Sequence, residues 1–366
     1  MQSQAFWPLF SQAVGIGLIL LASVDVFLTV FYPRTGKSVI SLQLSKVTWE
    51  LFRQISRWLP TNSKNILSYC GPILVVLIAV IWVCTFALGF ALLFWPALGQ
   101  GIQASQGKTP TDFATAFYYS GFTLTTLGVG DLVAKTGFWR LVTVLEAAVG
   151  FSIITASLSY LLSVYSSLTR RNTFALSLYH RSAGEVDAAS LLVRLKGYGQ
   201  FEPATQEISD IARELLFLLE THHAYPVLHY FHFGDPRYAL ARMSLISLDL
   251  ATLIKSALHQ EAYKALIESA AVAELESGGL DMLTQLSESF LGKVPASQLS
   301  EKQAWRRRYF KAIEMFEEND LKTVVDVEAG ADEYVVRREQ WNAIVLSFSE
   351  YMEHKWHDIA PAEREI

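Results

Sequence analysis

The sequence predicts an all-α membrane protein with three transmembrane helices followed by an α-helical cytoplasmic domain. Only 18% of the 366 residues are charged, whereas soluble domains carry about 25%. The mean hydropathy is +0.27. The charge is also unevenly distributed, because residues 1–171 hold 11 Lys+Arg and 5 Asp+Glu, and residues 172–366 hold 19 and 30. A membrane part followed by a water-soluble part explains this division.

Three apolar stretches are long enough to cross a bilayer, which takes about 20 residues of helix. Residues 6–32 contain one charge, Asp25, near their cytoplasmic end. Residues 65–107 contain no charge, and 73–94 form their core. Residues 141–169 contain only Glu146. An acid inside a membrane is costly, so Asp25 could pair with a base of the loop that follows it, and a role in gating is the alternative.

The loops predict the orientation of these spans. Residues 33–69 are rich in bases and contain one acid, Glu50; the bases are Arg34, Lys37, Lys46, Arg53, Arg57 and Lys64. Lys and Arg accumulate on the cytoplasmic side. We therefore expect a multi-pass protein of the cell membrane with its N-terminus outside and residues 172–366 in the cytoplasm. The first residues lack the basic region of a signal peptide.

Within this inner loop, apolar residues recur at helical spacing between 44 and 59, opposite basic ones; they are Leu44, Val47, Leu51, Phe52, Ile55, Trp58 and Leu59. This pattern is typical of an amphipathic helix lying on a membrane surface. The alternative is that the helix packs on the cytoplasmic domain.

Residues 109–131 lie between the second and third spans but are too apolar for a simple external loop. Thr111 or Asp112 can cap a short helix from Phe113 to about Thr125, which the chain leaves through alternating glycines. Glycine permits left-handed backbone, so that successive carbonyls can face one axis. Irregular backbone is tolerated at membrane depth where it is buried in protein or lines a water-filled path. We therefore expect a re-entrant helix and loop.

The segment Thr125-Thr126-Leu127-Gly128-Val129-Gly130-Asp131 resembles the filter signature of the potassium channel family, Thr-Thr-Val-Gly-Tyr-Gly-Asp. Tyr118 and Tyr119 stand where the pore helix of that family often has two tryptophans, and Gly150 matches the spacing of its inner-helix hinge glycine. The resemblance covers residues 70–170. It identifies a pore-loop channel with a single pore domain per chain. The pore domain then comprises residues 70–171, residues 1–69 precede it, and residues 172–366 form a helical regulatory domain of unrecognised family.

The resemblance implies a homotetramer whose filter binds K⁺ ions, with no organic cofactor and no other metal. Its implied ion-binding residues are Thr126, Leu127, Gly128, Val129 and Gly130, with Asp131 at the outer mouth. Asp131, Tyr118, Tyr119 and Glu146 would support the filter. Phe151, Ile154 and Leu158 would line the cavity below it, and Gly150 would be a gating hinge. No span carries a base at every third position, so we expect gating by the cytoplasmic domain rather than by voltage.

Two residues depart from the family pattern. Val129 replaces the usual tyrosine, and Phe122 stands where some members have a glutamate that pairs with the filter aspartate. A filter that is held less firmly discriminates less between cations, so a nonselective cation channel is the first alternative. A membrane receptor with a structural, filter-like loop is the second. An enzyme is disfavoured, because no nucleophile elbow, metalloprotease motif or phosphate-binding loop occurs.

Glu146 has two interpretations. Lying one turn before Gly150, it could form a ring of carboxylates that concentrates cations. Alternatively it accepts a hydrogen bond from a pore-helix hydroxyl such as Ser120 or Thr123 and stiffens the filter from behind, which is the interpretation we favour.

The cytoplasmic half reads as helices at 208–219, 240–258 and 304–316, with breaks near 197–203, 233–236, 278–279 and 330 and a short strand at 322–327. Its histidines cluster at His222, His223, His229 and His232. A structural role is favoured for them over a metal site or a proton sensor. The basic run 306–308 reads as a solvated face. We expect an unidentified cytoplasmic ligand and no nucleic-acid partner.

Overall fold

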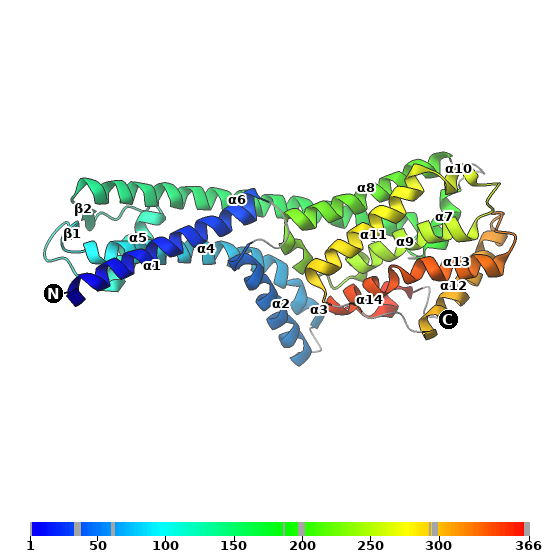
Figure 1. Ribbon diagram of the computed structural model, residues 1–366, viewed down its shortest axis with the longest axis horizontal. Coiled ribbons are helices and arrows are strands. Elements are labelled where there is room, and N and C mark those ends of the chain that lie inside the picture. The colour runs from blue at the N-terminus through cyan, green and yellow to red at the C-terminus, as the bar shows by residue number, and fades with distance from the viewer. Residues whose placement is uncertain are drawn as a thin grey trace. The chain divides into compact units, whose positions relative to one another are not determined.

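The computed structural model describes residues 2–32, 38–59, 63–185, 187–196, 202–292, 294 and 299–361. The chain forms two compact units, and α-helices dominate both (Figure 1). Unit 1 comprises Met1–Trp58 and Tyr69–Tyr165, and unit 2 comprises Leu59–Ser68 and Ser166–Ile366. The division of the sequence into 1–69, 70–171 and 172–366 stays a prediction.

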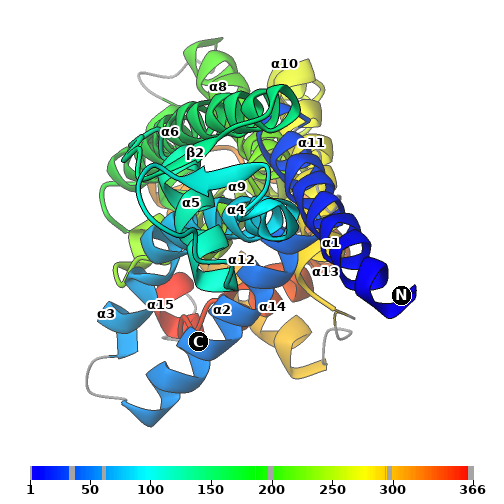
Figure 2. The same ribbon diagram turned by 90° about the vertical axis from the view of Figure 1, so that its left-hand side faces the viewer.

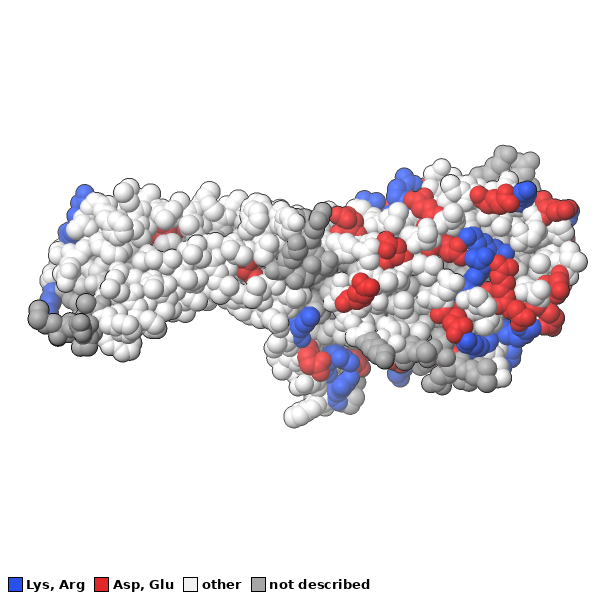
Figure 3. Space-filling model, viewed as in Figure 1, with Lys and Arg blue, Asp and Glu red and all other residues white. Residues whose placement is uncertain are grey.

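Within the residues that the structure describes, three helices are long and apolar enough to span a membrane, as the sequence predicted. The first is α1 (Gln2–Val26), which continues into a π-helical turn, η1 (Phe27–Phe31). The second is α4 (Cys70–Phe94), which ends in the 3₁₀ turn η3 (Trp95–Ala97), and the third is α6 (Gly137–Arg181). Charged side chains are sparse over these helices and dense over unit 2 in Figure 3, which agrees with the charge division of the sequence.

The first span packs along the second, outside the remaining elements of unit 1 (Figures 1 and 2). The two helices approach closely at Gly15 of α1 and Gly89 of α4. A Cβ atom on Gly15 would lie 2.5 Å from the Gly89 carbonyl oxygen, and one on Gly89 would lie 2.8 Å from a side-chain carbon of Ile19. Glycine at both positions is therefore what allows the backbones to pack this tightly.

A short helix and a two-stranded hairpin fill the segment between the second and third spans. Helix α5 (Phe113–Leu124) packs on α4 and lies between α4 and α6 in Figure 2. The strands β1 (Ile102–Ala104) and β2 (Leu132–Ala134) pair antiparallel, with Gln103 opposite Val133. The sequence predicted the helix but not the hairpin, because strands of three residues are too short to show alternation.

Helix α2 (Ile40–Trp58) is amphipathic, and its faces have different environments. Small hydroxyl residues and Trp49 form the buried face, whereas the apolar stripe is largely exposed, with Val47 65%, Leu51 52% and Trp58 87% exposed. The apolar stripe is therefore not covered within unit 1, and both interpretations of α2, on a membrane surface or packed on the domain at 172–366, stay predictions. Helix α3 (Ser63–Ser68) follows it.

Unit 2 is built around a helix that is buried along almost its whole length, α9 (Leu240–Ala257). Helices α7, α11, α13 and α14 pack against α9, and α8 packs along α11. The elements that follow α6 in unit 2 are α7 (Ala188–Leu195), α8 (Glu202–Ala224), η4 (Pro226–Tyr230), η5 (Pro236–Tyr238), α9, α10 (Lys264–Ile267), α11 (Ala270–Phe290), α12 (Leu299–Glu318), α13 (Val327–Glu339), α14 (Asn342–Tyr351) and α15 (Trp356–Ile359).

Two of the predicted helix breaks are wrong, because the glycines concerned lie inside helices. Gly279 is within α11, where an added Cβ would come 2.7 Å from a Leu248 methyl carbon. Gly330 is within α13, where a Cβ would come 2.2 Å from the Tyr309 hydroxyl oxygen. These glycines permit close helix packing and do not end the helices. The predicted break at 233–236 is present, and residues 197–201 lie outside the described residues.

The predicted strand at 322–327 is also wrong. Thr323 makes only an isolated antiparallel bridge with Leu258, and α13 begins at Val327. The Asp326 side chain accepts a hydrogen bond from the Ala329 N–H at 3.0 Å, so it caps the helix that the strand prediction overlapped.

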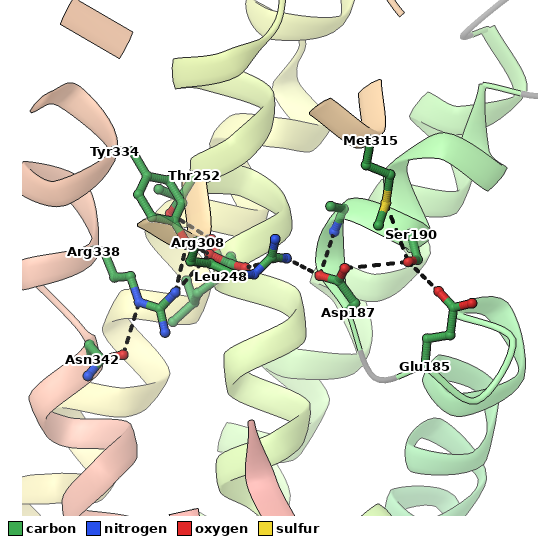
Figure 4. Close-up of polar contacts among 12 residues, drawn as sticks. Glu185, Asp187, Ser190, Leu248, Thr252, Arg308, Met315, Tyr334, Arg338 and Asn342 are labelled. Atoms are coloured by element: carbon green, nitrogen blue, oxygen red, sulfur yellow. Dashed lines mark hydrogen bonds and ion pairs between the residues drawn. The ribbon is translucent and has the colours of Figure 1, made fainter. Parts of the chain in front are cut away.

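A network of buried charges ties together the helices of unit 2 (Figure 4). Arg308 of α12, predicted on a solvated face, is 4% exposed and pairs with Asp187, which caps α7. Arg308 also lies 3.8 Å from Asp249 of α9, which accepts a hydrogen bond from the Tyr334 hydroxyl at 2.6 Å. Burial alone would lower the pKa of Arg308, but these two carboxylates raise it above its ordinary value. The prediction that Arg308 lies on a solvated face is therefore wrong. Its partners Asp187 and Asp249 are distant in the sequence, so the local pattern could not reveal them.

A second arginine completes the network. Arg338 of α13 is fully buried and donates hydrogen bonds to the Tyr334 hydroxyl at 2.7 Å and to Asn342 at 3.1 Å. It also lies 3.6 Å from Asp249. Two bases thus face two acids, which is the condition under which buried charges are tolerated.

Candidate functional site

The candidate site begins at the helix α5, whose ends are both capped. Asp112 accepts hydrogen bonds from the Thr115 N–H and the Thr115 hydroxyl, each at 2.9 Å, so the sequence prediction of a cap at 111 or 112 is resolved in favour of Asp112. At the other end the backbone folds back on the last turn. Thr126 N–H donates to the Thr123 carbonyl and Leu127 N–H donates to the Phe122 carbonyl, each at 2.9 Å. These bonds hold the start of the loop against the helix that precedes it.

The loop after α5 has left-handed backbone at every second residue. The φ angles are +57° at Thr126, +60° at Gly128 and +81° at Gly130. The sequence predicted this alternation for the two glycines. Thr126 extends it, although its side chain makes this conformation unfavourable by about 1 kcal/mol or more. Strain held at one non-glycine residue is typical of functional backbone.

The outer end of this loop is fixed by a residue that the sequence did not single out. Ser105, which follows β1, donates from its hydroxyl to the Gly130 carbonyl at 2.5 Å and from its N–H to the Asp131 carbonyl at 2.7 Å. No motif could have revealed Ser105, because it reaches the loop only through the β-hairpin.

The side chains of the loop are uncovered on one chain. Leu127 is 72% exposed and Val129 is 49% exposed. Behind the loop lies a cavity of about 480 Å³ whose lining includes Tyr119, Phe122, Thr123, Gly128 and Val144. Phe122 is buried and carries no group that could pair with Asp131. Large apolar side chains beside an unfilled cavity indicate that a single chain does not complete this region.

Tyr119 and Glu146 connect α5 to the third span. The Tyr119 hydroxyl is 2.8 Å from the Thr143 hydroxyl. The expected hydrogen bond to Glu146 is present, since the Ser120 hydroxyl donates to one oxygen of that carboxyl at 2.5 Å. Glu146 is fully buried, and its second oxygen has no hydrogen-bond partner in the described part of the chain. The geometry therefore agrees with the favoured interpretation of Glu146, whose role as filter support stays a prediction.

Gly150 lies directly against the end of α5. A Cβ at this position would come 1.8 Å from the Leu124 carbonyl oxygen, and α6 runs through it without interruption. The structure thus gives Gly150 a packing role beside the predicted loop, and the hinge role stays a prediction. The predicted cavity-lining residues all point away from the chain, with Phe151 68%, Ile154 54% and Leu158 55% exposed.

Asp25 binds donors that the sequence did not predict. It is 1% exposed, and one of its carboxylate oxygens accepts from the Ile40 N–H at 2.8 Å. The other accepts from the Ser41 hydroxyl at 2.6 Å and from the Trp82 indole at 2.8 Å. Asp25 of α1 therefore caps α2 and binds α4. The predicted pairing with a base is wrong for Lys46, Arg53 and Arg57; Arg34, Lys37 and the side chain of Lys64 lie outside what the structure describes.

The histidines do not form a metal site within the described ranges, where no group of three or more His, Cys, Asp or Glu side chains could hold a metal ion. His222, His229 and His232 are buried in unit 2. Burial, together with the positive charge of Arg171, lowers the pKa of His222 to about 4, and burial also lowers the pKa of His229 well below its ordinary value. Both rings are therefore neutral at pH 7.

Comparison with known proteins finds a family that matches the predicted pore segment. Residues 73–167 match a family described as ion channel. The chain is 32% identical over 218 residues to the uncharacterized membrane protein YdjJ of Bacillus subtilis (strain 168), and the match covers 59% of this chain and 62% of that protein. No solved structure matches. Residues 73–167, which contain most of α4, α5 with its loop and the first part of α6, are therefore similar to an ion channel family.

Proposed function

We propose that four copies of this chain form a potassium-selective pore in the cell membrane. In this proposal the backbone carbonyls of Thr126, Leu127, Gly128 and Val129 replace the hydration shell of K⁺. The observation that carries it is the left-handed backbone at residues 126, 128 and 130, since this alternation lets consecutive carbonyls share one side of the chain. The family match at 73–167 supports the ion channel activity itself.

The tetramer is supported by the single filter segment of the sequence and by apolar side chains that are exposed on one chain. The sequence contains one filter segment, so several copies are needed to surround an ion. Leu127 and Val129 of this segment are 72% and 49% exposed on the single chain. A neighbouring copy would bury these side chains, and each would contribute about 1.5–3 kcal/mol when fully covered.

Gating by unit 2 is supported by the continuity of the third span. The boundary between the units falls between Tyr165 and Ser166, inside the single helix α6. Beyond that boundary α6 is held by side chains of unit 2. Arg170 makes two hydrogen bonds to the Glu214 carboxylate, at 3.1 and 3.0 Å. A ligand that rearranges unit 2 would therefore act on the end of the helix that leads into the pore.

We also propose that the N-terminus lies outside and unit 2 in the cytoplasm. The support is the excess of bases over acids in residues 33–69. Helix α2 would then lie at the cytoplasmic surface, with its exposed apolar stripe in the inner leaflet and Arg57 toward the headgroups.

A nonselective cation pore is the second candidate, and the side chains at positions 122 and 129 support it. Val129 is half exposed and has no hydrogen-bonding group, and Phe122 cannot pair with Asp131. The outer end of the filter is thus held by Ser105 rather than by the groups that the family pattern has at positions 122 and 129. A filter held in this way could adjust to Na⁺ at a smaller energetic cost.

The test is K⁺ flux through purified full-length protein in liposomes. Gly128→Ala should abolish flux. Gly107→Ala is the matched control, because Gly107 also has left-handed backbone, at φ +75°, and neither glycine has an atom within 4 Å of an added Cβ. The two substitutions cost similar backbone strain, about 1–2 kcal/mol each, so a difference in flux reports the position. Flux that survives in Gly128→Ala, or no flux in the wild-type protein, would contradict the proposal.

A further inference from the structure

Four histidines and one arginine of unit 2 surround a small internal cavity of about 20 Å³. Arg171 comes from the end of α6, His222 from the last turn of α8 and His229 from η4. His232 and His354 complete the histidine set, and their rings stack with centroids 4.7 Å apart. A cavity of this size holds one water-sized species.

Arg171 is buried, and the described part of the chain offers it no carboxylate partner. It is 6% exposed, and it donates hydrogen bonds to the Leu228 carbonyl at 3.1 Å and to the Phe231 carbonyl at 2.9 Å. Its Nε–H group has no partner among the residues that the structure describes. A guanidinium keeps its charge in proteins, so the site must accommodate one full positive charge by other means.

The histidines add donors but no negative charge. His222 Nδ1 lies 2.8 Å from the Leu218 carbonyl, so this nitrogen carries the hydrogen. His229 stacks on Phe290, with ring centroids 3.9 Å apart, and its Nε2 atom is buried without a partner in the described part of unit 2. Arg171 and His229 both line the cavity, and in the tautomer with hydrogen on His229 Nε2 each has one buried N–H group without a partner in the described part of unit 2.

We propose that this cavity binds one small monovalent anion of the halide class, held between Arg171 Nε and His229 Nε2. An anion neutralises the buried guanidinium, which a water molecule cannot do. The small volume favours a compact anion over phosphate or a carboxylate. Because Arg171 belongs to the end of α6 and its acceptors belong to the segment at 228–231, the bound anion stabilises the packing of these two parts of unit 2. Chloride is the halide available in cells and is the natural probe. This site lies outside the pore, so it does not depend on the proposed channel function.

The first test measures the thermal midpoint of the full-length protein in detergent, with chloride exchanged for gluconate at constant ionic strength. Raising chloride from about 5 mM to about 300 mM should raise the wild-type midpoint by about 2 °C or more, because an anion that binds only the folded state stabilises it. His229→Phe should abolish the shift while it keeps the ring stacked on Phe290. Arg170→Gln is the matched control and should keep it, because Arg170 pairs with Glu214 and does not line the cavity.

The second test locates the ion in crystals grown in bromide. An anomalous peak in the cavity, within hydrogen-bonding distance of Arg171 Nε and His229 Nε2, is the expected result. The proposal is overturned by a wild-type midpoint that is equal in both salts, by an unchanged chloride shift in His229→Phe, or by a cavity that contains only water.

Discussion

Replacing Gly150 by alanine tests how tightly the third span packs on the end of α5. The new Cβ would lie 1.8 Å from the Leu124 carbonyl oxygen and 2.7 Å from the Leu124 carbonyl carbon. Unstrained contacts between carbon and oxygen are about 3.3 Å or longer, so the two helices must separate by roughly 1.5 Å. Overpacking of this kind costs about 1–3 kcal/mol. Leu124 immediately precedes the loop at 125–131, so we expect the separation to disturb that loop as well.

The assay is thermal unfolding of the detergent-solubilised protein together with K⁺ flux in liposomes. Gly150→Ala should lower the midpoint by roughly 2–12 °C and reduce flux. Gly17→Ala is the control, because Gly17 lies inside α1 and has no atom within 4 Å of an added Cβ. Alanine there should be neutral or slightly stabilising. If Gly150→Ala unfolds at the wild-type midpoint and changes only the open probability, Gly150 is a hinge and our packing argument is refuted.

Three further predictions concern buried polar groups, each checked by the unfolding midpoint. Asp25→Ala should destabilise unit 1 by about 2–5 kcal/mol because it leaves Trp82 and the start of α2 without an acceptor. Asp25→Asn should destabilise it less, and an equal loss of stability in the two variants would argue against the hydrogen bonds. Arg308→Met should cost about 3–5 kcal/mol because it leaves Asp187 buried and unpaired, and a neutral result would contradict the network. The pKa of His222 falls from 6.5 in the unfolded chain to about 4 on folding. As the pH falls, the unfolded chain therefore binds the proton before the folded chain does. The free energy of unfolding should fall by about 3 kcal/mol between pH 6.5 and pH 4. His222→Gln should reduce this loss of stability, and an unchanged pH profile would exclude His222 as its source.

The pore segment could be predicted because its signals are local. The spans follow from long apolar runs, and Asp112 lies directly before the helix that it caps. The alternation of Gly128 and Gly130 specifies the backbone conformation directly. The contact between Ser120 and Glu146 was also within reach, since a buried acid in a membrane requires a nearby donor.

What could not be predicted depends on contacts between residues distant in sequence. Gly279 and Gly330 look like helix ends, and only the positions of Leu248 and Tyr309 explain why they lie inside helices. Arg308 lies in a basic run of an acidic region, and its burial becomes intelligible only beside Asp187, which is 121 residues earlier in the chain. Asp25 likewise finds its donors on two other helices.

The measurement that tests the central claim most directly is the reversal potential of the reconstituted full-length protein with K⁺ on one side of the membrane and Na⁺ on the other. A selective filter at residues 126–130 predicts a reversal potential displaced strongly toward the K⁺ equilibrium value, together with loss of current in Gly128→Ala. A reversal potential near zero, meaning equal permeability to K⁺ and Na⁺, would contradict the claim of selectivity and favour the nonselective pore.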